Sequence, residues 1–303
     1  MLRKSAFALL AAILSIAILH PPLATAGAGG YALWFDGTDD EVVIPHHESI
    51  SFSAPPEAMT IEFWFKRGGP RSGVYHLLGK RAGCGDLNYN IGVEGANHDV
   101  VSFATAVGGS YVVHFAPLTT PDTIWTHVSF TADGSEIRMY VNGELVTAEA
   151  GIVSKEVLSP LKMGQSGTCG ASMRLVGWMD EVRIWSVART GDQIRDNYGR
   201  PVDPGSTGLV GYWNFDEDST DQQVRDLSPL GNHGTLGADG QPGADDPTRV
   251  PSTVPWTCLS VECPYAPSDV NCDGISDVRD VVAAVNVAFR GTPAAQPCCK
   301  YGW

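Results

Sequence analysis

The sequence predicts an all-β fold in which two antiparallel sheets pack as a sandwich, followed by a small calcium-loop–helix appendage. Three observations carry this prediction. Residues 31 to about 200 contain repeated short runs of alternating apolar and polar residues, with turn signals between them. Carboxylate-rich turns lead into such runs at 35–45 and 177–185. A loop with oxygen-bearing side chains at fixed spacing lies at 269–280.

Several runs have the pattern of half-buried strands. In 59–66, Ile61, Phe63 and Phe65 share one face, and the residues between them share the other. The runs 125–131 and 136–141 flank a short turn and predict a hairpin. Asn142-Gly143 is a stronger hairpin signal, because both residues tolerate positive φ.

One helix is expected within the β-domain. Thr190 can cap its first turn, and Gln193 completes a capping box. Ile194 and Tyr198 lie one turn apart and can pack back on a sheet. Beyond this helix, 208–216 has the pattern of another strand.

The chain divides into four parts. Residues 1–26 have the pattern of a secretory signal peptide, with a positive start, an apolar run too short to span a membrane, and a small-residue cleavage site. We therefore expect a secreted protein without a membrane span. The β-domain covers 31–236. Residues 237–257, rich in Gly, Pro, Asp and Ser, predict a linker. The Cys-rich remainder, 258–303, forms the calcium module.

Charge and cysteine content restrict the partners. The formal net charge is −14, which disfavours nucleic acid and suits a cation with oxygen ligands. Seven cysteines in an exported chain imply disulfides. We expect Cys84 to pair with Cys169, because both lie in glycine-rich loops. The pairing of the other five is left open; they are Cys258, Cys263, Cys272, Cys298 and Cys299.

The C-terminal loop matches a calcium-binding loop at each ligand position. Glycine stands at the sixth position, where the chain must turn around the ion, and an apolar helix pattern follows. The expected ligands are Asp269, Asn271, Asp273, the Ile275 carbonyl, Asp277 and Asp280. The segment 267–291 resembles one repeat of a type I dockerin, which implies a cohesin-like scaffold as partner. Because only one repeat is present, two alternatives remain: a calcium-bound cap, or half of a site that is completed elsewhere.

The β-domain resembles the laminin-G-like, concanavalin A-like jelly-roll family. The segments that carry the resemblance are 33–43, 59–64, 125–128, 140–143, 179–185 and 188–194. The resemblance implies that 208–236 completes the same sandwich in permuted order. It also implies calcium at the rim, with Asp36 and Asp180 as ligands and Asp39 or Asp40 as a further one. Glycan or an extracellular protein is the implied partner.

Aromatic residues give a weaker signal. Most tryptophans in strand patterns are expected in the core. Trp178 and Tyr111 adjoin loops and are the expected exposed aromatics. The pair His46-His47 is expected in a solvated turn.

Catalytic signatures are missing from the sequence. The superfamily's glucanases carry Glu-x-Asp-x-x-Glu on one strand, and this run is not found here, nor is Gly-x-Ser-x-Gly. Asp180 and Glu181 are adjacent and are expected to point to opposite faces of a strand. The sequence therefore predicts a non-catalytic, calcium-binding module for glycan or extracellular protein. The alternatives are a structural component docked through the dockerin-like repeat, and a glycoside hydrolase.

Overall fold

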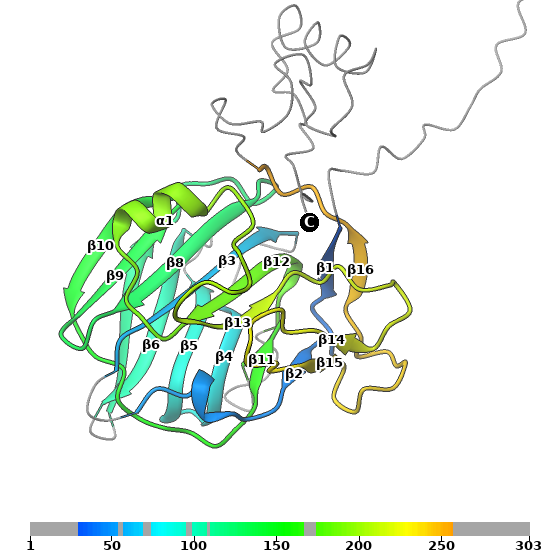
Figure 1. The fold of residues 1–303 in the computed structure, drawn as a ribbon, viewed down its shortest axis with the longest axis horizontal. Helices are drawn as coiled ribbons and strands as arrows, with labels where there is room; N and C mark the ends of the chain where they lie inside the picture. The colour runs from blue at the N-terminus through cyan, green and yellow to red at the C-terminus, as the bar shows by residue number, and fades with distance from the viewer. Residues whose placement is uncertain are drawn as a thin grey trace, which may run out of the picture.

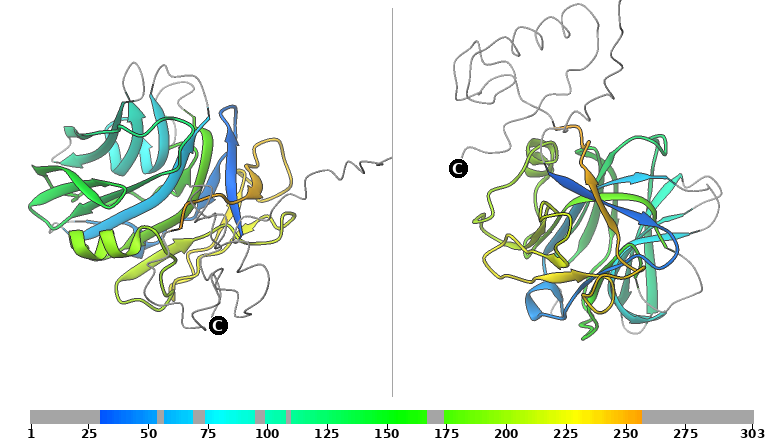
Figure 2. Two further views of the ribbon diagram at one scale, coloured as in Figure 1. Left: turned by 90° about the horizontal axis from the view of Figure 1, so that it is seen from above. Right: turned by 90° about the vertical axis from the view of Figure 1, so that its right-hand side faces the viewer.

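Two antiparallel sheets pack face to face, as the sequence predicts (Figures 1 and 2). The computed structural model describes residues 30–53, 57–68, 74–94, 99–107, 110–166 and 174–256. The predicted signal peptide and the predicted calcium module lie outside these ranges. Within them, the first and last strands, β1 and β16, run side by side at one edge of the sandwich (Figure 1).

One sheet, called sheet A, is built around the long strand β12. In sheet order its members are β10 (Glu144–Ala150), β9 (Glu136–Val141), β8 (Thr126–Ala132), β3 (Met59–Arg67), β12 (Val176–Trp185), β1 (Tyr31–Asp36) and β16 (Thr248–Pro251), with β13 (Leu209–Trp213) also paired to β12.

The other sheet, called sheet B, faces it across the core. In sheet order its members are β14 (Gln223–Val224), β15 (Gly234–Leu236), β2 (Val42–Ile44), β11 (Leu161–Met163), β4 (Tyr75–Gly83), β5 (Asp86–Glu94), β6 (Val100–Val107) and β7 (Ser110–Pro117).

Apolar side chains from the inner faces fill the space between the sheets. Phe63 and Phe65 of β3 are buried there, as the alternation predicts. Across the gap, the rings of Phe103 and Phe130 stack with their centroids 5.3 Å apart. Burial of these faces is the main force that holds the two sheets together.

The predicted hairpins are present. β8 pairs with β9, and β9 pairs with β10 through a turn at Asn142 and Gly143. These two residues have φ of 49° and 82°, the left-handed conformation that such a turn needs.

The predicted helix, α1 (Gly191–Asn197), covers part of the outer face of sheet A. Thr190 and Gln193 form the expected capping box, and Ile194 is buried beneath the helix. The indole Nε1 of Trp64, on the outer face of β3, donates to the carbonyl of Tyr198 at 2.9 Å. A short 3₁₀ turn, Glu48–Ile50, follows β2. Since α1 is the only α-helix in the described ranges, the outer face of sheet B carries no α-helix there.

Residues after α1 belong to the sandwich. β13 joins sheet A, and β14 and β15 join sheet B. Within the predicted linker 237–257, residues 248–251 instead form β16 and pair with β1. A four-residue strand is too short to show periodicity, and its partner is more than 200 residues away in sequence.

The prediction that Asp180 and Glu181 point to opposite faces is also wrong. Met179 and Val182 are both in the core, so the two residues between them face outward. The register between β12 and β3 shifts here, and Glu181 has φ of 55°. This β-bulge interrupts the alternation of a regular strand.

No helix in the described part of the chain is long and apolar enough to cross a membrane.

Candidate functional site

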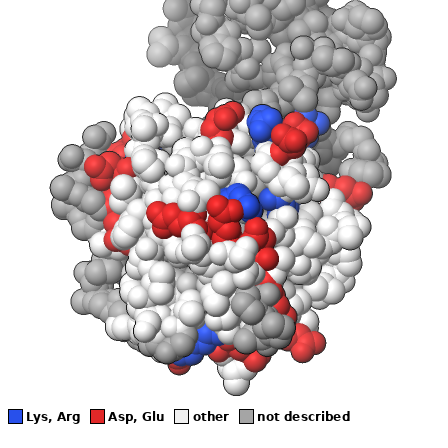
Figure 3. Space-filling view, turned by 90° about the vertical axis from the view of Figure 1, so that its left-hand side faces the viewer, with Lys and Arg blue, Asp and Glu red and all other residues white. Residues whose placement is uncertain are grey.

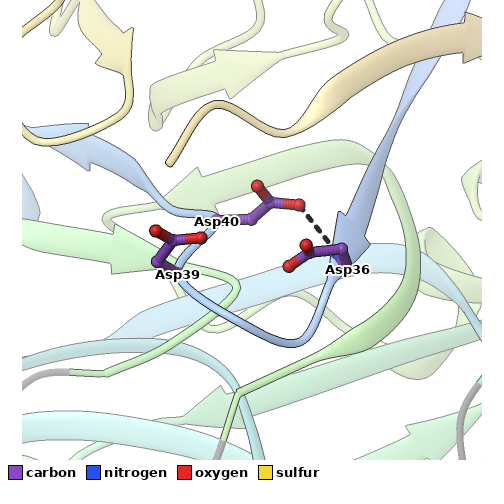
Figure 4. Close-up of side chains that lie close together, drawn as sticks. All are labelled: Asp36, Asp39 and Asp40. Atoms are coloured by element: carbon purple, nitrogen blue, oxygen red, sulfur yellow. Dashed lines mark hydrogen bonds between the residues drawn. The ribbon is translucent and has the colours of Figure 1, made fainter. Parts of the chain in front are cut away.

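Three aspartates gather at the turn between β1 and β2 (Figure 4). Asp36, Asp39 and Asp40 each offer a carboxylate oxygen, and these oxygens lie within 4.8 Å of one another. Calcium holds its oxygen ligands at about 2.3–2.6 Å, so ligands of one ion lie within about 5 Å of each other. The spacing of the three carboxylates is therefore compatible with a single calcium ion.

Hydrogen bonds fix the carboxylates of this acidic turn. Asp40 accepts from the backbone N–H of Asp36 at 2.7 Å, and Asp36 accepts from the backbone N–H of Thr38 at 2.6 Å. Burial is the main reason that the pKa of Asp40 is raised to about 6. The hydrogen bond from the backbone of Asp36 lowers this pKa, whereas the negative charges of Asp36, Asp39 and Asp246 raise it. A cation at the turn would relieve this repulsion.

The other predicted metal ligands lie elsewhere. Asp180 is not part of the acidic turn's cluster. It is fully buried, and it accepts hydrogen bonds from the Ser252 hydroxyl at 2.5 Å and from the Glu181 N–H at 2.8 Å. The predicted loop ligands fall outside the described residues: Asp269, Asn271, Asp273, Ile275, Asp277 and Asp280.

A pocket of about 470 Å³ lies on the outer face of sheet B. Its walls include His76 and Arg81 of β4, Glu94 of β5 and Tyr111 of β7. These side chains face outward because the residues beside them, such as Val93, belong to the core. Ala104 and Ala106 of β6 also face this side, and their small side chains leave room above the sheet. Tyr111 is 47% exposed, as its position beside a loop predicts.

Polar groups along this pocket, here called the sheet B pocket, are held by neighbours. Nδ2 of Asn90 donates to Nδ1 of His76 at 2.9 Å, which leaves the ring proton of neutral His76 on Nε2. Burial lowers the pKa of His76 to about 4, with the charge of Arg81 adding to it, so the ring is neutral at pH 7. Arg81 donates to the carbonyls of Gly83 and Cys84 in the turn that closes one end.

The tryptophans are mostly buried, as predicted. Trp178, predicted to be exposed, is instead half-buried. The ring centroid of Trp178 lies 4.3 Å from that of Trp34, and the ammonium of Lys66 lies 3.9 Å from the Trp178 centroid. The indoles therefore form a cation–π cluster on sheet A rather than an open stacking surface.

Two smaller predictions have mixed outcomes. His47 is exposed, but His46 is half-buried and its Nδ1 lies 2.8 Å from the buried ammonium of Lys80. Cys84 is disulfide-bonded. Since Cys169 lies outside the described residues, the pairing of these two stays a prediction.

Sequence reasoning missed most of the sheet B pocket. His76, Arg81 and Glu94 come from strands whose register could not be inferred from one sequence. One signal was present, because Arg81 directly precedes the glycine-rich turn at 82–85. An arginine beside such a turn can bond to its carbonyls, and it does so here.

The fold is a sandwich of two antiparallel sheets in which α1 covers part of the outer face of sheet A, while the outer face of sheet B carries no α-helix in the described ranges. Residues 36–195 match a family model, described as the concanavalin A-like lectin/glucanases superfamily, which covers more than half of the chain. The chain therefore belongs to this superfamily, in agreement with the resemblance seen in its sequence. No curated protein matches the chain.

Solved structures share the fold. A protein from Bacteroides ovatus, proposed to bind carbohydrate, matches with a TM-score of 0.54 and 22% identity, over 75% of this chain and 61% of that one. The chain thus spans about three fifths of that relative's length. Domain 4 of an extracellular arabinanase from Geobacillus stearothermophilus, in complex with arabinotriose, matches with a TM-score of 0.42 and 18% identity, over 55% and 76% of the two chains.

Proposed function

We propose that this protein is a secreted, non-catalytic carbohydrate-binding module that holds its glycan in the sheet B pocket. The observation that carries the proposal is the pocket itself. It combines an exposed tyrosine ring with charged and polar side chains on the face that α1 leaves open.

The chemistry of the pocket suits a sugar. A pyranose ring has an apolar face that can stack on an aromatic ring, and Tyr111 offers such a surface. Glu94 accepts hydrogen bonds, while Arg81 and the Nε2–H of His76 donate them. A few placed polar groups within an apolar pocket are typical of small-ligand sites.

Calcium is the second part of the proposal. We assign one ion to the acidic turn, with Asp36, Asp39 and Asp40 as its protein ligands. The predicted loop at 269–280 would hold another. Neither ion is expected to take part in a reaction; each would hold the surrounding loop in place. Docking to a cohesin-like scaffold remains an expectation from the dockerin-like sequence.

The two adjacent carboxylates of β12 are too buried to take part in hydrolysis. The carboxylate of Glu181 accepts hydrogen bonds from Arg183 at 2.8 Å and from the Tyr212 hydroxyl at 2.6 Å, and Glu181 is 1% exposed. Asp180 is fully buried. A glycosidase needs carboxylates that reach the scissile bond, so these two cannot serve as its acid and nucleophile.

A glycan array tests the proposal directly. The full-length secreted protein should bind a defined subset of glycans in calcium, and binding should weaken in excess chelator. Tyr111→Ala should lose the signal on the same glycans. Release of reducing sugar from those glycans, or an array on which the protein binds nothing, would contradict the proposal.

A further inference from the structure

One buried arginine has no carboxylate partner among the residues that the structure describes. Five arginines in the described ranges are buried, and four of them make ion pairs. These four are Arg67, Arg183, Arg189 and Arg249, and their acidic partners are Asp122, Glu181, Glu62 and Glu217. Arg81 is 6% exposed, and its only hydrogen bonds to described residues go to two backbone carbonyls.

The same arginine lines the sheet B pocket. A guanidinium has five N–H donors, and the bonds to Gly83 and Cys84 use two of them. Burial lowers the pKa of Arg81, which reflects partial loss of its hydration. A buried cation of this kind gains most from an anion that reaches it with good geometry. The protein's net charge is −14, and acidic side chains gather on the face shown in Figure 3, so a buried arginine with no carboxylate partner among the described residues is a local exception.

We propose that the sugar bound in this pocket carries a single carboxylate, as a uronic acid residue does, and that Arg81 receives it. This inference rests on the proposed function. A planar guanidinium binds a carboxylate through two parallel hydrogen bonds, which a neutral hydroxymethyl group cannot reproduce.

The position of Glu94 sets the orientation of the ligand. Arg81 pairs with Leu87 in the register of β4 and β5, and Glu94 lies seven residues further along β5. At about 3.3 Å per residue, the two backbone positions are roughly 23 Å apart, at opposite ends of the pocket. Tyr111 pairs with Ala106 of β6, which places its backbone nearer the Arg81 end, and the charges of both Arg81 and Glu94 still reach its hydroxyl. The carboxylate therefore binds at the Arg81 end, and hydroxyl groups bind at the Glu94 end.

Calorimetry with paired ligands tests this inference. The probes are oligogalacturonate and oligoglucuronate, each compared with its own methyl ester, which removes the charge and keeps the sugar. The full-length protein should bind at least one acid at least tenfold more tightly than its ester. The preference for acid over ester should weaken as the salt concentration rises, because dissolved ions screen the attraction between Arg81 and a partly exposed carboxylate.

Variants assign the preference to Arg81. Arg81→Gln should bind acid and ester equally, and Arg81→Lys should keep part of the preference. Glu94→Gln keeps an acceptor oxygen at the far end of the pocket and should leave the preference for acid over ester unchanged. Arg195→Gln, on the exposed surface of α1, is the matched control and should change nothing. If Arg81→Gln does not fold, a reduced preference in Arg81→Lys beside an unchanged preference in Glu94→Gln still supports the inference, and an unchanged preference in Arg81→Lys overturns it.

The remaining outcomes separate the two proposals. Equal binding of acid and ester, or binding of neutral glycans alone, would overturn the inference and leave the carbohydrate-binding function standing. Failure to bind any glycan would overturn both.

Discussion

The carboxylate of Asp40 accepts a hydrogen bond from the backbone N–H of Asp36 at 2.7 Å, although the two side chains carry like charges. This contact holds the acidic turn closed. It also places a buried carboxyl, with its pKa raised to about 6, next to two other acids. The arrangement is costly without a cation, and it makes the turn sensitive to pH.

Replacing Asp40 by Asn should stabilise the calcium-free protein at pH 7. A carboxyl whose pKa is raised on folding contributes stability below about pH 4, and this contribution is lost as the pH rises through 6. Asn keeps an oxygen that can accept from Asp36 and removes the charge. We expect a gain of about 1 kcal/mol, or about 2–4 °C in Tm, at pH 7 and a smaller gain at pH 4. Thermal melts in chelator measure it; Asp192→Asn, exposed on α1, is the control.

Calcium should reverse the sign of that effect. Binding at 100 times Kd stabilises a folded protein by about 2.7 kcal/mol, so the wild-type Tm should rise by about 5–10 °C. Asp40→Asn and Asp36→Asn should lose most of this rise. Below pH 6 the wild type should respond less, because protons compete for Asp40. If the Tm of Asp36→Asn rose as much as that of the wild type, calcium would not bind at the acidic turn.

The C-terminal loop should contribute a separate calcium site. Titration calorimetry of the full chain should give two ions per protein. Asp273→Ala should remove one, Asp40→Asn the other, and the double variant both. If Asp273→Ala still bound two ions, the loop prediction would be wrong.

Tyr111 should matter for glycan binding where Phe115 does not. Both lie on β7 with similar exposure, 47% and 45%, but only Tyr111 lines the sheet B pocket. We expect Tyr111→Ala to weaken binding at least tenfold, or about 1.4 kcal/mol, and Phe115→Ala to leave the affinity within twofold. Equal losses would point to the exposed edge of the sheet as the binding surface.

The buried ion network of sheet A should dominate stability. Glu62 bonds to Arg189 at 2.7 Å and to the indole N–H of Trp185 at 3.0 Å, and it is fully buried. Glu62→Gln removes the negative charge and leaves buried cations, which costs about 3–5 kcal/mol. Asp192→Ala breaks an exposed pair with Arg195 and should cost less than about 1 kcal/mol. Urea denaturation of both variants gives the comparison.

Local signals in the sequence predicted much of the fold. The alternation in β3, the Asn142-Gly143 turn and the Thr190–Gln193 capping box each act over a few residues, and each has its expected structure. The family resemblance named Asp36 and Asp180, with Asp39 or Asp40, as calcium ligands; the structure brings Asp36, Asp39 and Asp40 together and leaves Asp180 elsewhere.

Features that depend on distant contacts could not be predicted. The pairing of β16 with β1, the bulge at Asp180 and Glu181, and the meeting of Arg81 with Tyr111 depend on sheet register. Register is set by the packing of whole strands, so single residues carry little trace of it. The sheet B pocket therefore became visible only in the structure.

Mapping the glycan-binding face by NMR tests the central claim most directly. A glycan selected on the array is titrated into the isotope-labelled protein, and amide shifts are followed. Shifts concentrated on 76–81, 87–94 and 104–113 would place the ligand on sheet B, as we expect. Shifts concentrated around Trp34, Trp178 and α1, with those strands unchanged, would contradict the account.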